Sequence, residues 1–592
     1  MRQMGTKARV LTALLGSFLI AGIYFAAVYQ NIPFIYDIND DVAMRNVAAG
    51  VITGTPDAHL IHIKYLLGLV ISGMYRLVPG LDWYGLVLIG IILFSFSMIL
   101  YRGLAERKGW VWKLAYVLLA LLLFTGMGLF HVTAFQWTTA AAIPGAAGIY
   151  LFYTSETKER FQMFLEEGIS VFLILLSLAI RDDVFLMVLP IAGLAFWWRY
   201  GSLKRKGKLP VTLDHIRVPA GLLAGTLLLL GTEAAAYHSP QWREFRTYNV
   251  NREAIMDYYG LETYQEDPDF FDSLDISPEE AENLKRYSLY LVEDLYSEKM
   301  AALAEHFRDV YLKRHSFGER MSAGIEKLYE HLGKDTYHSS NLLCLCMIAL
   351  ALGLCAGKSK RQLGLAGSML AVWVLYWMYL GYRNRIIERV GFALYLLAFL
   401  SMLAVWYRTS FLESREEEKA KEGISWTKFL MTAGIGILLF LNAAVTWKAV
   451  EGVNTWRRDY NLRFLEVNRY MEEHKENVYF MTTFSIETYT DNFTVRRNFA
   501  FSNLLSVGGW HTFSPLENEK KDRLGIGEPK EDICRKENVY VISLENVNLR
   551  YMERYFESLY GENYGGSERI DVLDYGDQKF EVYDFSLKEE KR

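Results

Sequence analysis

Cysteine is scarce in this chain, which has only four in 592 residues. Three of them, Cys344, Cys346 and Cys355, share one apolar stretch, and Cys534 stands alone in a polar region. This distribution excludes a secreted scaffold held together by disulfides. The three neighbouring cysteines have no histidine or aspartate companions, so they are better explained as small buried residues than as a metal cluster.

Several motifs that would reveal a chemistry are also missing. The chain has no basic patch with interleaved aromatic residues, which excludes nucleic acid as a partner. Its last 145 residues contain no glycine-rich phosphate loop, no nucleophile elbow and no paired metal ligands. We find no internal repeat, and the charged run 413–421 is typical of a solvated loop. The function must be sought in how apolar and charged blocks alternate.

Long apolar segments dominate the chain. Hydrophobic residues make up 52% of it and charged residues 22%, a mixture that requires apolar blocks to alternate with polar ones. A helix of about 20 mostly apolar residues crosses a bilayer. By this measure we expect eleven spanning helices, at 8–29, 84–103, 111–130, 135–153, 165–180, 184–200, 218–236, 341–357, 363–382, 390–407 and 428–447.

Basic residues predict the orientation of these helices. The segment 60–78 is long enough to span, but it carries His62, Lys64 and Arg76, which suit a helix lying in the membrane interface. If it does not span, the inside loops collect lysine and arginine, as the positive-inside rule requires. We therefore predict a multi-pass protein of the plasma membrane. Its N-terminus is expected in the cytoplasm, behind an uncleaved signal anchor, and its C-terminal region outside.

This topology divides the chain into four parts. Residues 1–236 form the first part of the membrane domain, with an acidic first outer loop at 30–83, and residues 340–447 form the second part. Between them lies an outer insert, 237–339, with 12 Lys or Arg against 21 Asp or Glu. The last part, 448–592, has 21 against 27, so both outer regions are acidic.

Local patterns predict the structure of the two outer regions. In the insert, Ser277-Pro278-Glu279-Glu280 has the pattern of a capped helix start, which predicts a helical insert. In the last part, the segments 477–483, 538–543 and 579–585 have the composition of strands. Helical spacing over 462–474 and 549–560 flanks them. We therefore expect an outer α/β domain at the C-terminus.

Three carboxylates follow the first helix directly, at Asp37, Asp40 and Asp41. Acidic side chains beside hydrocarbon are costly unless they are solvated or paired, which favours a catalytic role. The alternative is structural: Asn39 caps a helix whose dipole suits Asp40 and Asp41, and Asp41 pairs with Arg45 four residues later. Capping leaves Asp37 unexplained. A divalent cation could also bind such a run, although one short cluster is a weak metal signal.

A second cluster lies in the short outer loop before the tenth span, at Arg383, Arg385 and Arg389. Three arginines outside oppose the positive-inside tendency, so another interaction should retain them. The planar guanidinium fork suits the oxygens of a phosphate or pyrophosphate. The alternative is that Arg385 and Arg389 pair with Glu388 and the acidic insert.

Further candidates for substrate contact are scattered along the outer side. Arg181 adds a cation at the tip between the fifth and sixth spans, unless its aspartate neighbours simply neutralise it. Glu233 is the acid expected deepest in the membrane, which marks it as functional by default. The remaining candidates each have an ordinary structural explanation as well: His59, His62, His131, Gln136 and Trp377.

Over residues 1–450 the chain resembles the polytopic glycosyltransferases of superfamily C, which use polyprenyl-phosphate sugars. The resemblance rests on the acidic first outer loop, Asp37 to Asp41, and on the interfacial helix entered through Thr55-Pro56-Asp57-Ala58-His59. It implies that Asp40 or Asp41 is the catalytic base and that Arg383 and Arg385 hold the lipid phosphate. The second acidic pair of the metal-dependent members is missing from the turn 128–136, so the resemblance does not imply metal dependence.

These observations predict an α-helical polytopic membrane protein of the superfamily C type, with an outer helical insert and an outer α/β domain. The resemblance implies transfer of a sugar, with inversion, from a polyprenyl-phosphate donor to an envelope glycan or a lipid-linked acceptor on the outer face. One alternative is a polysaccharide polymerase or ligase of the O-antigen type, which uses a diphosphate-linked chain. Another is a transporter or flippase without chemistry.

Overall fold

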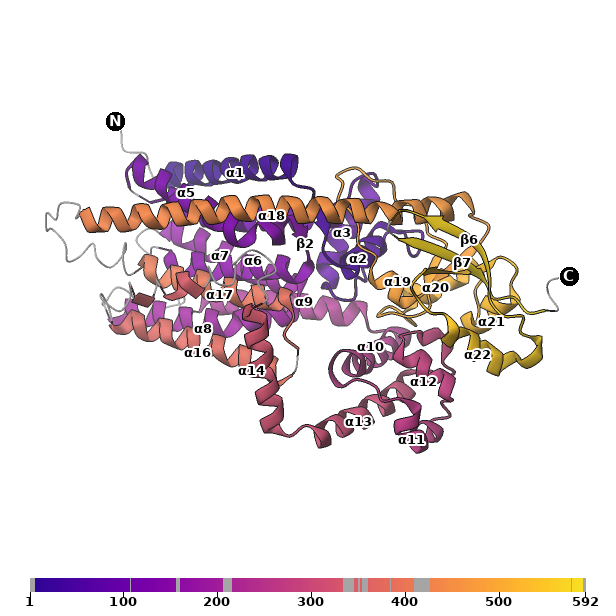
Figure 1. Ribbon diagram of the computed structural model, residues 1–592. Coiled ribbons are helices and arrows are strands. Elements are labelled where there is room, and N and C mark those ends of the chain that lie inside the picture. Colours follow the sequence, from indigo (N-terminus) through magenta and orange to yellow (C-terminus); the bar gives the residue numbers. More distant parts are fainter. Residues whose placement is uncertain are drawn as a thin grey trace.

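The computed structural model describes residues 6–106, 108–155, 160–205, 216–333, 345–349, 352–353, 360–383, 385–408, 426–576 and 578–588. Figure 1 shows a bundle of long helices at one end of the molecule and a small sheet domain at the other, with the helices of the insert beside that domain. The prediction of a mostly helical protein with a C-terminal sheet region is confirmed.

Nine helices in the described part are long and apolar enough to cross a membrane. They confirm the interpretation as a membrane protein. Their bounds are α1 (Thr6–Asn31), α4 (Trp83–Leu104), α5 (Trp110–Thr133), α7 (Arg160–Ile180), α8 (Asp182–Arg205), α9 (Arg217–Ala236), α16 (Lys360–Tyr382), α17 (Glu388–Tyr407) and α18 (Trp426–Glu473).

Two of the eleven expected spans are not among these nine. The segment 135–153 forms α6 (Trp137–Thr154), which is less apolar because it begins with Trp-Thr-Thr and contains Pro144. All of its residues are buried, which makes α6 the centre of the bundle. The expected span 341–357 lies largely outside the described residues, so the count of eleven stays a prediction.

The segment expected in the interface is too short to span. It forms α3 (Tyr65–Leu77), a helix of 13 residues. At 1.5 Å per residue it is about 20 Å long, against a hydrocarbon core of about 30 Å. This length agrees with the choice not to count 60–78 as a span, and its place in the interface stays a prediction.

The insert at 237–339 is helical in its described part, as expected. Ser277 Oγ accepts a hydrogen bond of 3.2 Å from the backbone N–H of Glu280, and the Glu280 carboxylate accepts one of 2.9 Å from the Ser277 N–H. This reciprocal cap satisfies two backbone donors at the start of α12. The insert helices are α10 (Pro240–Glu253), α11 (Pro268–Ser273), α12 (Pro278–Lys285), α13 (Ser297–Arg314) and α14 (Phe317–Gly333).

The C-terminal domain is built on a mixed sheet with strand order β4-β3-β5-β7-β6. The three predicted strands are confirmed as β3 (Val478–Met481), β5 (Val539–Leu544) and β7 (Lys579–Asp584). Sequence patterns missed β4 (Leu504–Ser506), which pairs parallel to β3, and β6 (Glu568–Asp574), which pairs antiparallel to β7. Its helices are α19 (Thr483–Glu487), α20 (Pro515–Leu524), α21 (Pro529–Arg535) and α22 (Arg550–Tyr560).

One continuous helix joins the bundle to this domain. We expected a span at 428–447 and a separate helix at 462–474, but α18 runs unbroken for 48 residues. Figure 1 shows it, in orange, along the whole bundle and into the sheet domain. There Phe464, Val467 and Met471 pack against the sheet. The sheet domain is thus connected to the membrane domain by a continuous helix and not by a loop.

A small parallel pair of strands positions the acidic loop that follows α1. Ile35 and Tyr36 of β1 (Ile35–Tyr36) pair with Ala134 and Phe135 of β2 (Ala134–Phe135), the link between α5 and α6. Directly after β1 the chain enters α2 (Asn39–Ala49). The acidic loop is therefore fixed beside the start of the most buried helix of the bundle.

The orientation can be tested by cysteine labelling in a background without the four native cysteines. Asn518 on α20 and Lys360 at the start of α16 are both exposed. We expect an impermeant maleimide added to intact cells to label Asn518→Cys and to spare Lys360→Cys. The reverse pattern would contradict the predicted topology.

Candidate functional site

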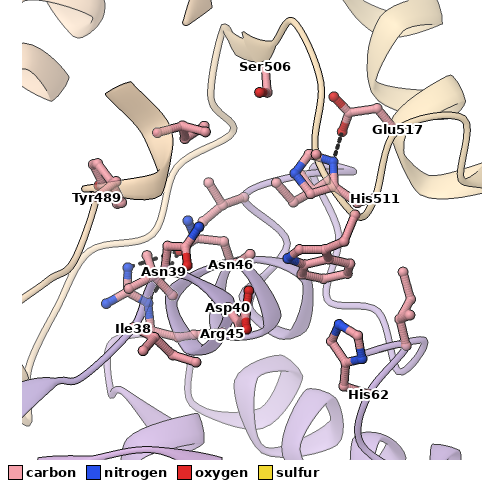
Figure 2. A pocket seen from close by; sticks show the side chains of 18 of the residues that line it. Ile38, Asn39, Asp40, Arg45, Asn46, His62, Tyr489, Ser506, His511 and Glu517 are labelled. Carbon is pink, nitrogen blue, oxygen red and sulfur yellow. Dashed lines mark hydrogen bonds and ion pairs between the residues drawn. The ribbon is translucent and has the colours of Figure 1, made fainter. Parts of the chain in front are cut away.

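A cleft of about 1000 Å³ lies where the membrane domain, the insert and the C-terminal domain meet. Figure 2 shows α2 with Ile38, Asn39, Asp40 and Asn46 along one side, and Ser506, His511 and Glu517 of the C-terminal domain across from it. The insert adds Asp257 and the loop before α17 adds Arg385. Segments distant in sequence therefore build this site together.

Only one of the three loop aspartates lines the cleft. Asp40 is half-buried and faces it, whereas Asp37 and Asp41 are not part of its lining. The helix α2 is preceded by Ile38, which makes no capping hydrogen bond through its side chain. The capping explanation based on Asn39 therefore does not describe this helix start. Asp40 keeps a carboxylate in the cleft without acting as a cap.

Asp41 belongs to the core. It is fully buried, and its Oδ1 accepts hydrogen bonds from the Tyr84 hydroxyl at 2.8 Å and from the Trp137 N–H at 3.1 Å. Burial raises the pKa of Asp41 well above its usual value, although these two donors oppose the shift. Its contacts join α2 to α4 and α6. The expected pair with Arg45 does not form, because Arg45 turns to other partners.

Asp37 holds the long helix. Its carboxylate accepts a hydrogen bond of 2.6 Å from Arg457 of α18, whose guanidinium also donates to the backbone oxygen of Asp37. Helix capping did not explain this side chain. Its contacts with Arg457 join the acidic loop to α18.

The arginines of the loop before α17 differ in whether they line the cleft. Arg383 and Arg385 both lie over the ring of Tyr258, and Arg385 also pairs with Asp257 at 3.0 Å. Arg385 lines the cleft and Arg383 does not. Pairing with the acidic insert was the alternative explanation for Arg385, and that contact is present.

Two cationic side chains meet in the cleft without a full set of acceptors. Arg181 lies 4.1 Å from the ring centre of Trp137, and Arg389 lines the same cleft. In the part of the chain that the structure describes, the buried Nε atoms of both arginines have no hydrogen-bond partner. Burial, together with the nearby Arg389 guanidinium, lowers the pKa of Arg181 although Asp183 opposes this shift. Two nearby guanidinium groups with spare donors have the chemistry of an anion site, although Arg181 also pairs with Asp183 at 3.3 Å.

His62 and Glu233 also line the cleft. The His62 ring stacks on Trp137, with 5.1 Å between ring centres. Burial lowers its pKa to about 4, so the ring is neutral at neutral pH and does not add to the positive charge. Glu233 accepts a hydrogen bond of 2.8 Å from the Tyr65 N–H, which ties the end of α9 to the start of α3.

The other predicted contact residues lie outside the cleft lining. His59 pairs with Asp57 at 2.7 Å, His131 stacks on Phe392 and Gln136 caps α6. Trp377 is buried against the aromatic rings of Trp373 and Tyr395. These four have structural surroundings.

Sequence reasoning placed no functional residue in the C-terminal domain, yet that domain supplies one wall. Glu487 is the clearest example: burial, then the charges of Asp40 and Asp257, raise its pKa. The loop around Trp510 and His511 is another part of this wall. No local motif marks these residues.

A buried ion pair holds the wall in place. Arg45 of α2 lies 2.8 Å from Asp491 of the C-terminal domain, and Asp491 also pairs with Arg497 at 2.6 Å. Burial alone would raise the pKa of Asp491, but the two guanidinium groups hold it below its usual value. The wall and α2 are thereby locked at a fixed separation.

In the ranges that the structure describes, no group of three His, Cys, Asp or Glu side chains is placed to hold a metal ion. A scan against models of protein families and a search of curated proteins both found no match to this chain.

Replacing Asp491 should destabilise the fold. Asp491→Asn leaves Arg45 without its nearest carboxylate, which we expect to lower the thermal unfolding midpoint by about 5 °C at neutral pH. Because the pKa of Asp491 is depressed by folding, its contribution is present above about pH 4 and is lost as the pH falls further. The difference from wild type should therefore shrink in acid. The exposed Asp522→Asn is the matched control, and equal midpoints for both variants would contradict this role.

Proposed function

We propose that the protein is a membrane glycosyltransferase that moves a sugar from a polyprenyl-phosphate donor to an envelope glycan or lipid-linked acceptor. One observation carries the proposal: Asp40 shares its cleft with Arg181 and Arg389, whose buried Nε atoms lack acceptors among the described residues. A carboxylate in the same cleft as two guanidinium groups with spare donors is what transfer from a phosphate leaving group requires, although Arg181 also pairs with Asp183 at 3.3 Å.

An apolar cavity between the helices supports a donor that is also a lipid. It has a volume of about 310 Å³ and lies between α4, α5, α6 and α17, lined by rings and aliphatic side chains such as Phe124, Leu396 and Phe399. On α17 it begins at Phe392, three residues after Arg389, so both side chains lie on one face of the helix. A phosphate at Arg389 would thus have an apolar chain continue into this cavity.

The proposed step conserves atoms and charge. The acceptor hydroxyl oxygen bonds to the anomeric carbon of the sugar while the bond from that carbon to the phosphate oxygen breaks. The bonding electrons leave with the polyprenyl phosphate, whose charge Arg181 and Arg389 stabilise. The hydroxyl proton passes to Asp40 and from there to water, and attack opposite the leaving group inverts the anomeric centre.

The base is tested by one isosteric change. Asp40→Asn keeps the size of the side chain but removes its proton acceptor, and we expect the transfer rate to fall about 1000-fold. The assay follows radiolabelled sugar from polyprenyl-phosphate hexoses and pentoses into product with purified protein in nanodiscs. The exposed Asp522→Asn is the control. Full activity of Asp40→Asn would remove the base from the proposal.

The phosphate site is tested by comparing two arginines from the same loop. Losing charged hydrogen bonds to the donor should make Arg389→Ala raise the donor KM by about 30-fold. Arg383→Ala, which alters a side chain outside the cleft lining, should leave it within about threefold. Equal effects of the two changes would contradict a phosphate site at Arg389. Use of diphosphate-linked chains alone would instead identify a polymerase or ligase.

A further inference from the structure

The loop between β4 and α20 forms one wall of the cleft. A Cβ on Gly508 would lie 1.7 Å from the backbone oxygen of Tyr287 in the insert, so only glycine permits this close approach. Phe513 adopts a φ of 65°, in the left-handed region. The loop is therefore held in one shape against the insert, and it presents Trp510 and His511 to the cleft.

A buried carboxylate orients the His511 ring. Glu517 Oε2 lies 3.3 Å from His511 Nδ1, and Glu517 is only 2% exposed. Figure 2 shows this pair across the cleft from Asp40 and His62. Burial alone would raise the pKa of Glu517, but His511 and the ammonium groups of Lys520 and Lys521 hold it below its usual value. The carboxylate contacts the ring at Nδ1, so Nε2 is the ring nitrogen left for a ligand.

Trp510 completes this wall with an apolar face. It lines the cleft, and its ring centre lies 4.7 Å from that of His62. An aromatic face beside an oriented hydrogen-bonding ring is a combination that recognises a sugar, whose C–H face packs on the indole while a hydroxyl bonds to the imidazole. The proposed lipid phosphate lies at Arg181 and Arg389, and Arg181 is linked to this wall through the stacked rings of Trp137 and His62.

We propose that Trp510 and His511, with Glu517 as positioning residue, form a carbohydrate subsite that holds the acceptor. Only the identification of this sugar as the acceptor rests on the proposed function. Carbohydrate binding by the wall itself stands on the loop geometry and the imidazole–carboxylate pair.

The test measures binding without donor or turnover. Full-length protein in nanodiscs is applied to immobilised di- to tetrasaccharides of glucose, mannose, galactose, rhamnose and N-acetylglucosamine. We expect the wild type to retain at least one of these glycans, and His511→Gln and Glu517→Gln to bind it about tenfold more weakly. His474→Gln, which changes an exposed histidine near the end of α18, should bind like wild type. Thermal unfolding midpoints show whether each variant is folded.

The outcomes separate this inference from the proposed function. No retained glycan, or equal binding by folded wild type and His511→Gln, would overturn the carbohydrate subsite. Retention lost in His511→Gln, with no polyprenyl-phosphate sugar ever consumed, would keep the subsite and overturn the glycosyltransferase. If transfer occurs, Glu517→Gln should raise the acceptor KM about tenfold and leave the donor KM unchanged. A rise in both would contradict the positioning role.

Discussion

The buried contact between Arg45 and Asp491 is the constraint on which the cleft depends. It joins α2, which carries Asp40, to the domain that forms the opposite wall. Backbone contacts reinforce it, since the N–H of Phe493 donates to the oxygen of Phe34 at 2.9 Å. Two charges taken out of water are stable only when each keeps its partner. The C-terminal domain therefore cannot separate from the acidic loop without leaving a charge unpaired in the protein interior.

The three acids of the first loop have different roles because of this arrangement. Asp41 and Asp37 make structural hydrogen bonds that fix α2 and α18. Asp40, one position away from Asp41 on the helix, faces the open side. The same separation holds for the arginines, where Arg385 is matched by Asp257 and Arg389 keeps a spare donor among the described residues. Residues of identical type thus differ in chemistry through what lies beside them.

Sequence patterns predicted the elements better than the contacts. Apolar length gave the helices, and the alternation of strand residues gave β3, β5 and β7, because both are local properties. The expected membrane topology was enough to predict that Asp40, Arg181 and Arg389 lie on the same side of the membrane. The partners of Asp41 lie 43 and 96 residues away, so no local pattern reveals them. Glu487 and His511 escaped for the same reason. The unbroken α18 was missed because its charged middle looks like the end of a span.

The single helix α18 connects the membrane bundle to both walls of the cleft. Over 48 residues without a proline, α18 is a rod about 72 Å long. A membrane helix adjusts its inclination to the thickness of the surrounding lipid. Five degrees of inclination at one end displaces the other end of such a rod by about 6 Å. Because Asp37 and the sheet are both attached to the far half of α18, such a displacement carries both walls of the cleft together.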